Sequence, residues 1–120
     1  MGKIIIADDS SFQRKILGDI ISAIGHEVEA VESGQALLDK VASEKYDGIC
    51  LDLLMPEMTG IEVLEKLQPM ENVPPVIVIS ADIQVKKKEQ CLALGAKAFV
   101  NKYIEKDSLE AVFKEHLINV

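Results

Sequence analysis

Residues 3–9, KIIIADD, join a continuous apolar run to two adjacent carboxylates, and three later runs of the chain also lead into a reactive polar residue. The later runs are residues 48–51 before Asp52, residues 76–79 before Ser80 and residues 98–100 ahead of Lys102. Continuous apolar runs are typical of strands that are covered on both faces, as in a parallel sheet. Because ligands bind beyond the carboxyl ends of such strands, three carboxylates, a hydroxyl and an ammonium are predicted to share one pocket.

Helical patterns fill the segments between these runs, so strands and helices alternate along the chain. Residues 27–31, EVEAV, alternate charged and apolar side chains, which indicates a strand with one wetter side at the edge of the sheet. Ser10, Thr59 and Asp107 each precede a Glu or Gln by three residues, a pattern that marks helix starts. The expected buried stripes are Phe12, Ile16, Ile20 and Ile24; Ile61, Leu64 and Leu67; and Leu109, Val112, Phe113 and Leu117. The alternation predicts an α/β fold, a doubly wound parallel sheet with helices on both faces.

Length and composition favour one domain that spans residues 1–120, with no second domain. The hydrophobic fraction of 48% suits a filled core, while the net charge of −7 argues against a nucleic-acid binder, which needs clustered Lys and Arg. No apolar run approaches the roughly 20 residues that cross a bilayer, and no signal peptide precedes the first strand. Cys50 and Cys91 lack CxxC spacing and are expected to be buried small hydrophobic residues of a cytoplasmic protein.

With these residues in place, the chain resembles the receiver domain of two-component response regulators, most of all the stand-alone chemotaxis type. The matching residues are Asp8-Asp9, Asp52, Met55-Pro56, Thr59-Gly60, Ser80-Ala81, Phe99 and Lys102. Each match is weak alone, but all of them in order are highly specific. The resemblance implies the flavodoxin-like fold, a five-stranded parallel sheet of order 2-1-3-4-5. That order would place the strand at residues 27–31 at an edge, which explains why no site residue follows it.

The resemblance also implies that Asp52 accepts a phosphoryl group from a phosphohistidine on a sensor histidine kinase or a His-phosphotransfer protein. A carboxylate that attacks a charged phosphoryl group meets repulsion, and two neighbouring carboxylates increase it unless a cation intervenes, so the acidic cluster itself implies a metal. Mg²⁺ suits these hard oxygen ligands. In the family pattern Asp9 and Asp52 bind it directly, Asp8 binds through water, and the backbone carbonyl of Leu54 completes the set. Lys102 and Ser80 would contact other phosphoryl oxygens.

The same resemblance implies a signalling switch rather than a classical enzyme, with only self-catalysed phosphotransfer and slow autodephosphorylation. Ser80 and Phe99 would change arrangement, and a downstream target would read the face of the fourth helix, fifth strand and last helix. The fourth helix, expected from Ile83 to Leu94, has few apolar anchors in its first turns, which suits a switching surface. The run Lys86-Lys87-Lys88 is interpreted as a solvated helix face, and the protein is expected to be a monomer.

Three positions depart from the family pattern or leave it open. Tyr103 follows Lys102 where the family usually has proline, so the peptide bond between them can be cis or trans on sequence grounds. Leu54 and Asp82 stand where the family tunes phosphoryl hydrolysis, which leaves the lifetime of the phosphoryl group open. A degenerate receiver acting as a fixed interaction module is one alternative function. A phosphohydrolase of the haloacid dehalogenase class is another, disfavoured because its two acids would stand two residues apart. The cognate kinase and the pathway also stay open.

Overall fold

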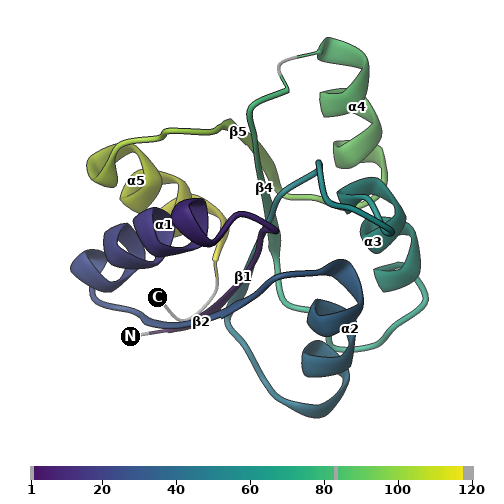
Figure 1. Ribbon diagram of the computed structural model, residues 1–120, viewed down its shortest axis with the longest axis horizontal. Helices are drawn as coiled ribbons and strands as arrows, with labels where there is room; N and C mark the ends of the chain where they lie inside the picture. The colour runs from purple at the N-terminus through teal and green to yellow at the C-terminus, as the bar shows by residue number, and fades with distance from the viewer. Residues whose placement is uncertain (1, 83, 118–120) are drawn as a thin grey trace.

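Strands and helices alternate throughout the computed structural model, which describes residues 2–82 and 84–117 (Figure 1). The strands are β1 (Lys3–Ala7), β2 (Glu27–Val31), β3 (Gly48–Leu51), β4 (Val76–Ser80) and β5 (Ala98–Asn101). The helices are α1 (Ser11–Ile24), α2 (Gly34–Ser43), α3 (Gly60–Leu67), α4 (Val85–Ala93) and α5 (Lys106–His116). All strand pairs are parallel, in the order β2-β1-β3-β4-β5. The predicted flavodoxin-like fold is confirmed.

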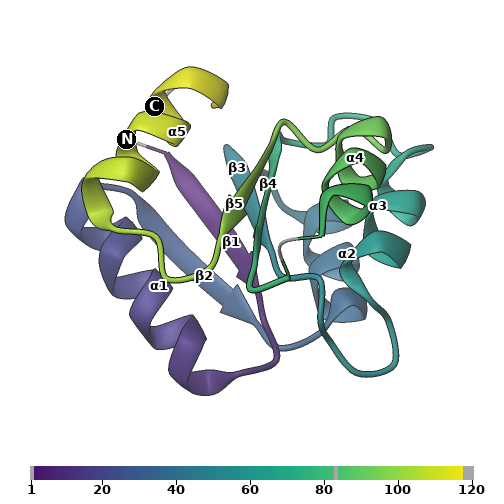
Figure 2. The same ribbon diagram turned by 90° about the horizontal axis from the view of Figure 1, so that it is seen from above.

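Helices cover both faces of the sheet, so the three central strands are buried on both sides (Figure 2). Helices α1 and α5 lie on one face, and α2, α3 and α4 lie on the other. Alternate side chains of each central strand point to opposite faces and enter separate clusters. The cluster under α1 and α5 contains Ile4, Ile6, Ile21, Cys50, Ile77, Ile79, Leu109, Phe113 and Leu117. The other contains Ile5, Ala7, Leu37, Ile49, Leu51, Val63, Leu64, Val78 and Cys91, among others.

Both cysteines are buried and free, as expected from the sequence. Burial raises the pKa of the Cys50 thiol to about 12, which keeps it protonated and unreactive at neutral pH. Cys91 is the single buried residue of α4, so the expectation that this helix carries few apolar anchors is confirmed. The helix begins at Val85, and the expected start at Ile83 lies outside the described residues.

The alternating strand β2 lies at the edge of the sheet, as predicted. Its Glu29 carboxylate accepts a hydrogen bond of 3.0 Å from the Tyr46 hydroxyl and lies 3.0 Å from the Lys40 ammonium. Lys40 also pairs with Glu44 at the end of α2. Glu29 therefore ties the edge strand to α2 through Lys40 and to the loop before β3 through Tyr46.

Two expectations about helices are wrong in detail. In α1, Phe12 is 69% exposed and the buried residue is Ile21, which packs with Leu17, Ile20 and Ile24. Each step of four residues advances roughly 40° beyond a full turn, and this angle accumulates over three steps. Side chains spaced by four from Phe12 to Ile24 therefore cannot all face the core. Asp107, the predicted cap, lies within the first turn of α5. The observed capping residue is Glu105, whose side chain makes no capping hydrogen bond. The caps at Ser10 and Thr59 are confirmed, the latter as a full capping box.

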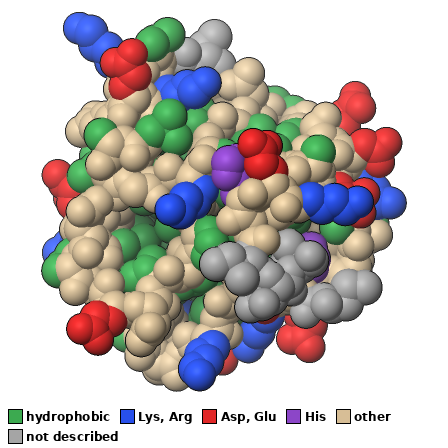
Figure 3. Space-filling model, turned by 180° about the vertical axis from the view of Figure 1, so that it is seen from behind, with side chains coloured by type: hydrophobic (Ala, Val, Ile, Leu, Met, Phe, Trp, Pro, Cys, Tyr) green, Lys and Arg blue, Asp and Glu red, His purple; other side chains and the backbone are tan. Residues whose placement is uncertain are grey.

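The surface that Figure 3 shows carries acidic and basic side chains interspersed, without a single large basic patch. This distribution agrees with the net charge of −7. Within residues 2–82 and 84–117, no helix has the length and apolar character needed to cross a bilayer.

Candidate functional site

Two of the predicted carboxylates meet because β1 and β3 are neighbours in the sheet. Ala7 pairs with Leu51 at the ends of these strands, so the next residues, Asp8 and Asp52, leave the sheet side by side. The Asp52 amide donates a hydrogen bond of 3.0 Å to the Ala7 carbonyl. Asp8 and Asp52 are 3% and 5% exposed, whereas Asp9 is exposed. One carboxylate oxygen from each of the three lies within 4.8 Å of the others.

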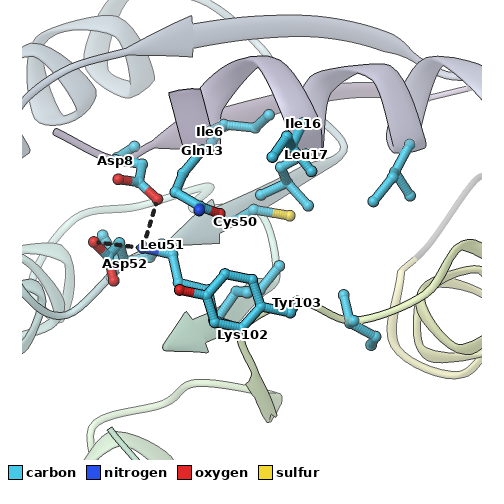
Figure 4. Close-up of a pocket in the computed structure, with 14 residues that line it drawn as sticks. Ile6, Asp8, Gln13, Ile16, Leu17, Cys50, Leu51, Asp52, Lys102 and Tyr103 are labelled. Atoms are coloured by element: carbon cyan, nitrogen blue, oxygen red, sulfur yellow. Dashed lines mark ion pairs between the residues drawn. The ribbon is translucent and has the colours of Figure 1, made fainter. Parts of the chain in front are cut away.

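Lys102 reaches the same point from the end of β5 (Figure 4). Its Nζ lies 3.0 Å from Asp8 Oδ2 and 3.4 Å from Asp52 Oδ2, and its side chain is only 14% exposed. The Lys102 amide donates a hydrogen bond of 2.7 Å to the Ser80 carbonyl, which holds the end of β5 beside the end of β4. A lysine fifty residues from Asp52 in sequence therefore contacts it directly in the fold.

The electrostatics of this cluster favour an added cation. Burial raises the pKa of Asp52, and the Asp8 carboxylate raises it further, while Lys102 and a hydrogen bond from the Leu54 amide act in the opposite direction. Burial acts to lower the pKa of Lys102, but the two carboxylates outweigh it and raise that pKa. Three carboxylates exceed the two neighbouring cations, the Lys102 ammonium and the Arg14 guanidinium, so an excess of negative charge is left in a partly desolvated place.

The donor set fits Mg²⁺. Octahedral oxygen ligands at roughly 2.1 Å from this ion lie about 3 to 4 Å from one another, a spacing that oxygens within 4.8 Å can reach with small side-chain rotations. The ligands are hard carboxylate oxygens, and exposed Asp9 leaves room for the waters that Mg²⁺ usually retains. Receiver domains bind Mg²⁺ at such an aspartate cluster, and Asp8, Asp9 and Asp52 are the candidate ligands here.

Gly60 lets α3 begin against the backbone of the site. A Cβ atom at this position would lie 2.5 Å from the Asp52 carbonyl oxygen and 2.8 Å from Leu53 Cα. The Gly60 amide donates a hydrogen bond of 2.9 Å to the Leu53 carbonyl. The start of α3 therefore supports the segment that carries Asp52, which explains the Thr59-Gly60 pair in physical terms. Leu54, in the loop between them, exposes 56% of its surface.

Ser80 lies at the same rim, at the end of β4, and is fully buried. Its hydroxyl accepts a hydrogen bond of 3.1 Å from the Asp82 amide. Among the described residues, no hydrogen bond joins Ser80 Oγ to the three carboxylates or to the Lys102 ammonium. Phe99 lies on β5 and packs, partly buried, against the cluster under α2, α3 and α4.

The peptide bond between Lys102 and Tyr103 is trans, which answers the question that the sequence left open. Tyr103 adopts φ 69°, in the left-handed region, and exposes 74% of its surface. A non-glycine residue in this region costs of order 1 kcal/mol or more, and such residues cluster at functional sites. Lys102 therefore contacts the carboxylates although the residue that follows it is not proline. That residue, Tyr103, has a left-handed backbone conformation.

Two contacts at the site were not foreseen from the sequence. The Arg14 guanidinium donates a hydrogen bond of 2.7 Å to the Asp8 carbonyl, and the Ser10 amide donates one of 2.9 Å to Asp8 Oδ1. Together they fix the backbone and the carboxylate of Asp8. A signal existed in the sequence, because Arg14 lies four residues after the helix cap Ser10 and so on the same side of α1.

An apolar crevice continues from the acidic cluster toward α1 (Figure 4). It is narrow, and Lys102 and Tyr103 line it opposite Gln13 and Ile16. Its floor includes Cys50, from the strand that ends before Asp52. The crevice therefore adjoins the candidate phosphoryl site on its apolar side.

Comparisons with known proteins agree with this geometry. The family model described as the response regulator receiver domain matches residues 4–114. The chemotaxis protein CheY of Thermotoga maritima is 35% identical over 104 residues, covering 85% of this chain and 87% of its own. The sensory/regulatory protein RpfC of Xanthomonas campestris is 35% identical over 104 residues, 83% of this chain but only 14% of the relative.

A solved structure gives the same result for the fold. The response regulator TrrA of Thermotoga maritima, in complex with Mg²⁺ and a beryllium fluoride group, has a TM-score of 0.86 and 27% identity. The alignment covers 96% of this chain and 98% of that one. Fold, site and sequence agree, and the chain belongs to the response regulator receiver domain family.

Proposed function

We propose that this protein is a phosphorylation-dependent switch of a two-component phosphorelay, with Asp52 as the phosphoryl acceptor. The observation that carries the proposal is the Asp52 carboxylate, which is 5% exposed, lines the crevice and shares the Lys102 ammonium with Asp8. The partner would be a sensor histidine kinase or a His-phosphotransfer protein. Support for such a donor comes from relatives that include RpfC and a hybrid signal transduction histidine kinase of Dictyostelium discoideum.

In the proposed reaction an oxygen of the Asp52 carboxylate attacks the phosphorus of the donor's phosphohistidine. A P–O bond forms, the P–N bond breaks, and the electron pair leaves on the imidazole nitrogen, which takes a proton from water. Lys102 neutralises charge on the transferred group, and its 3.4 Å distance from Asp52 leaves it beside the new acyl phosphate. Catalysis by the chain therefore consists of positioning and electrostatic stabilisation.

Asp8, Asp9 and Asp52 would hold a Mg²⁺ ion, with the Leu54 carbonyl as a further ligand. When bound, this ion supplies charge neutralisation between the attacking carboxylate and the phosphoryl oxygens. Arg14 and Ser10 hold Asp8 in place for this role through the hydrogen bonds described above.

The signal would leave the site through Ser80 and Phe99. Rotation of the Ser80 hydroxyl toward a phosphoryl oxygen would vacate space on β4, which pairs with β5 through Val78 and Phe99. The face that a target would read is formed by α4, β5 and α5. It includes a groove lined by Val85, Lys88, Phe99, Val100 and Asn101. Val85 and Leu92 on α4 expose 67% and 41% of their surface, an apolar pair suited to a partner protein.

Phosphoryl uptake tests the proposal directly. Purified protein is incubated with acetyl phosphate and Mg²⁺ and weighed intact, beside Asp52→Asn. We expect the wild type to gain the mass of one phosphoryl group and Asp52→Asn to gain none. A gain that survives Asp52→Asn would overturn the assignment of the acceptor. No gain in either protein would favour the fixed interaction module, and rapid turnover of generic phosphate esters would favour the phosphohydrolase.

A further inference from the structure

The three consecutive lysines of α4 are not equivalent. Lys87 is half-buried, and its Nζ lies 3.2 Å from Asp82 Oδ2. Lys86 and Lys88 are exposed, and within the described part of the chain neither forms an ion pair. The expectation that the whole run is a solvated helix face is therefore wrong for its central member. The pair would be hard to find from sequence, since Asp82 precedes Lys87 by five residues and lies in a loop.

Asp82 joins this lysine to the switch serine. Its amide donates to Ser80 Oγ at 3.1 Å, and its Oδ1 accepts a hydrogen bond of 3.0 Å from the Gln84 amide. Its Oδ2 forms the ion pair with the Lys87 ammonium, and the Asp82 side chain is only 15% exposed. Every polar group of this residue except its carbonyl thus has a partner on either β4 or the start of α4. The result is a continuous polar chain from Ser80 to Lys87 in the first turn of the helix.

The start of α4 has few other attachments. Among the described residues, the side chain of the capping residue Gln84 makes no capping hydrogen bond, and the buried residue of the helix, Cys91, lies two turns later. A carboxylate before a helix N-terminus is favourable because it faces the unpaired amides and the positive end of the dipole. Asp82 therefore acts as the anchor of the first turn, although it lies outside the helix.

We infer that Lys87 is a positioning residue of the switch, which acts through Asp82 to hold Ser80 and the first turn of α4 in the unphosphorylated arrangement. The inference rests on the proposed function, since it assigns a part in the response to phosphorylation. When Ser80 turns its hydroxyl to a phosphoryl oxygen, Oγ leaves the Asp82 amide. Asp82 then loses a contact that fixes its loop, and the Lys87 ion pair weakens with it. The first turn of α4 is released toward the target face.

Lys87→Gln tests this inference against two matched controls, Lys86→Gln and Lys88→Gln, which remove the same charge from the same helix. Amide hydrogen exchange is measured on residues 84–88, first without phosphodonor and then with excess acetyl phosphate and Mg²⁺. Lys87→Arg, which keeps the ion pair, serves as the conservative variant.

Without phosphodonor, we expect Lys87→Gln to speed exchange of these amides by roughly two- to fivefold, the range for a partly exposed ion pair. Lys86→Gln, Lys88→Gln and Lys87→Arg should exchange like the wild type. With phosphodonor, the difference between Lys87→Gln and the wild type should shrink, because phosphorylation has already weakened the pair. An ion pair with a merely structural role would instead speed exchange equally in both forms, and that result would overturn the inference. Equal exchange in all four variants without phosphodonor would also overturn it.

The two proposals fail in different ways in this experiment. Absence of phosphoryl mass in the wild type refutes the proposed function whatever the exchange rates are. A phosphorylated wild type whose α4 exchange is unchanged, with Lys87→Gln still faster, refutes the role of Lys87 alone. A double variant, Asp82→Asn with Lys87→Gln, adds a further check. Its effect on exchange should equal that of either single variant if the two side chains act as one unit.

Discussion

Helices α3 and α4 cover the same face of the sheet and follow neighbouring strands, yet they are attached very differently. α3 buries four of its eight residues, Gly60, Val63, Leu64 and Leu67, and starts with a full capping box. α4 buries Cys91 among nine residues and has no side-chain cap at Gln84. α3 follows the strand before Asp52, and α4 follows the strand that ends in Ser80. The helix beside the proposed acceptor, Asp52, is therefore firmly packed, and the helix beside the proposed switch residue, Ser80, is weakly packed, as the proposed function requires.

The sharpest way to break this comparison is the same substitution in both helices. Leu64→Ala in α3 removes a side chain that is 1% exposed, and we expect a loss of about 3 kcal/mol in the free energy of unfolding. Leu92→Ala in α4 removes one that is 41% exposed, and about 0.5 kcal/mol is expected. Urea unfolding followed by circular dichroism measures both. Similar losses would show that the two helices are packed alike.

The close approach at the start of α3 gives the next largest effect. Gly60→Ala would place a methyl group 2.5 Å from the Asp52 carbonyl, so we expect a loss of about 1 to 3 kcal/mol and slower phosphoryl uptake from acetyl phosphate. Gly18→Ala in α1 is the matched control. Its methyl group would meet Val28 at an ordinary 3.7 Å, and a mid-helix alanine should stabilise by about 0.5 to 1 kcal/mol. The same sign for both variants in urea unfolding would contradict this explanation of Gly60.

The fold was predictable because its signals are local and strong. Four apolar runs, one alternating run and polar caps at Ser10 and Thr59 correspond to observed elements. The strand ends of a parallel sheet then bring Asp8, Asp52 and Lys102 together with no knowledge of side-chain positions. The site was therefore predictable to the extent that it follows from topology.

The features that the sequence did not reveal depend on the exact direction of single side chains and on the backbone conformation of single residues. Phe12 and Ile16 have the right character for a core stripe, but the twist of α1 turns them outward and selects Ile21. The left-handed Tyr103 and the Lys87 pair depend on how a loop returns to a helix. Asp107 shows a related ambiguity, because an acidic residue favours both the capping position and the first turn of a helix.

A smaller effect is expected from the caps of the two helices. Thr59→Ala removes the hydroxyl that accepts a hydrogen bond from the Glu62 amide, and it should lower the free energy of unfolding by about 1 kcal/mol. Gln84→Ala at the equivalent position of α4 removes no capping hydrogen bond, so its cost should be close to zero. Thermal and urea unfolding of both variants provide the measurement. If Gln84→Ala lowered the free energy of unfolding as much as Thr59→Ala, the Gln84 side chain would have to cap α4.

The smallest expected effect is a difference in how the two helix starts respond to acid. At the start of α3 the Glu62 amide donates to the Thr59 hydroxyl, which does not titrate at acidic pH, whereas at the start of α4 the Gln84 amide donates to the Asp82 carboxylate. The hydrogen bond from the Gln84 amide lowers the pKa of Asp82, and the Lys87 ammonium lowers it further. Since the folded pKa lies below the unfolded one, ionised Asp82 stabilises the folded loop above the unfolded value. That contribution is lost as the pH falls through the folded pKa.

Protection factors of the first-turn amides of α4 should therefore decline from about pH 5 to about pH 3 more steeply in the wild type than in Asp82→Asn. The asparagine can still accept the Gln84 hydrogen bond, so the variant removes the charge and keeps the acceptor. Measuring the amides of the buried strand β3 in the same samples corrects for changes in global stability. Equal slopes in both proteins would show that the charge of Asp82 does not anchor α4, and the looseness of this helix would then be set by its poor packing alone.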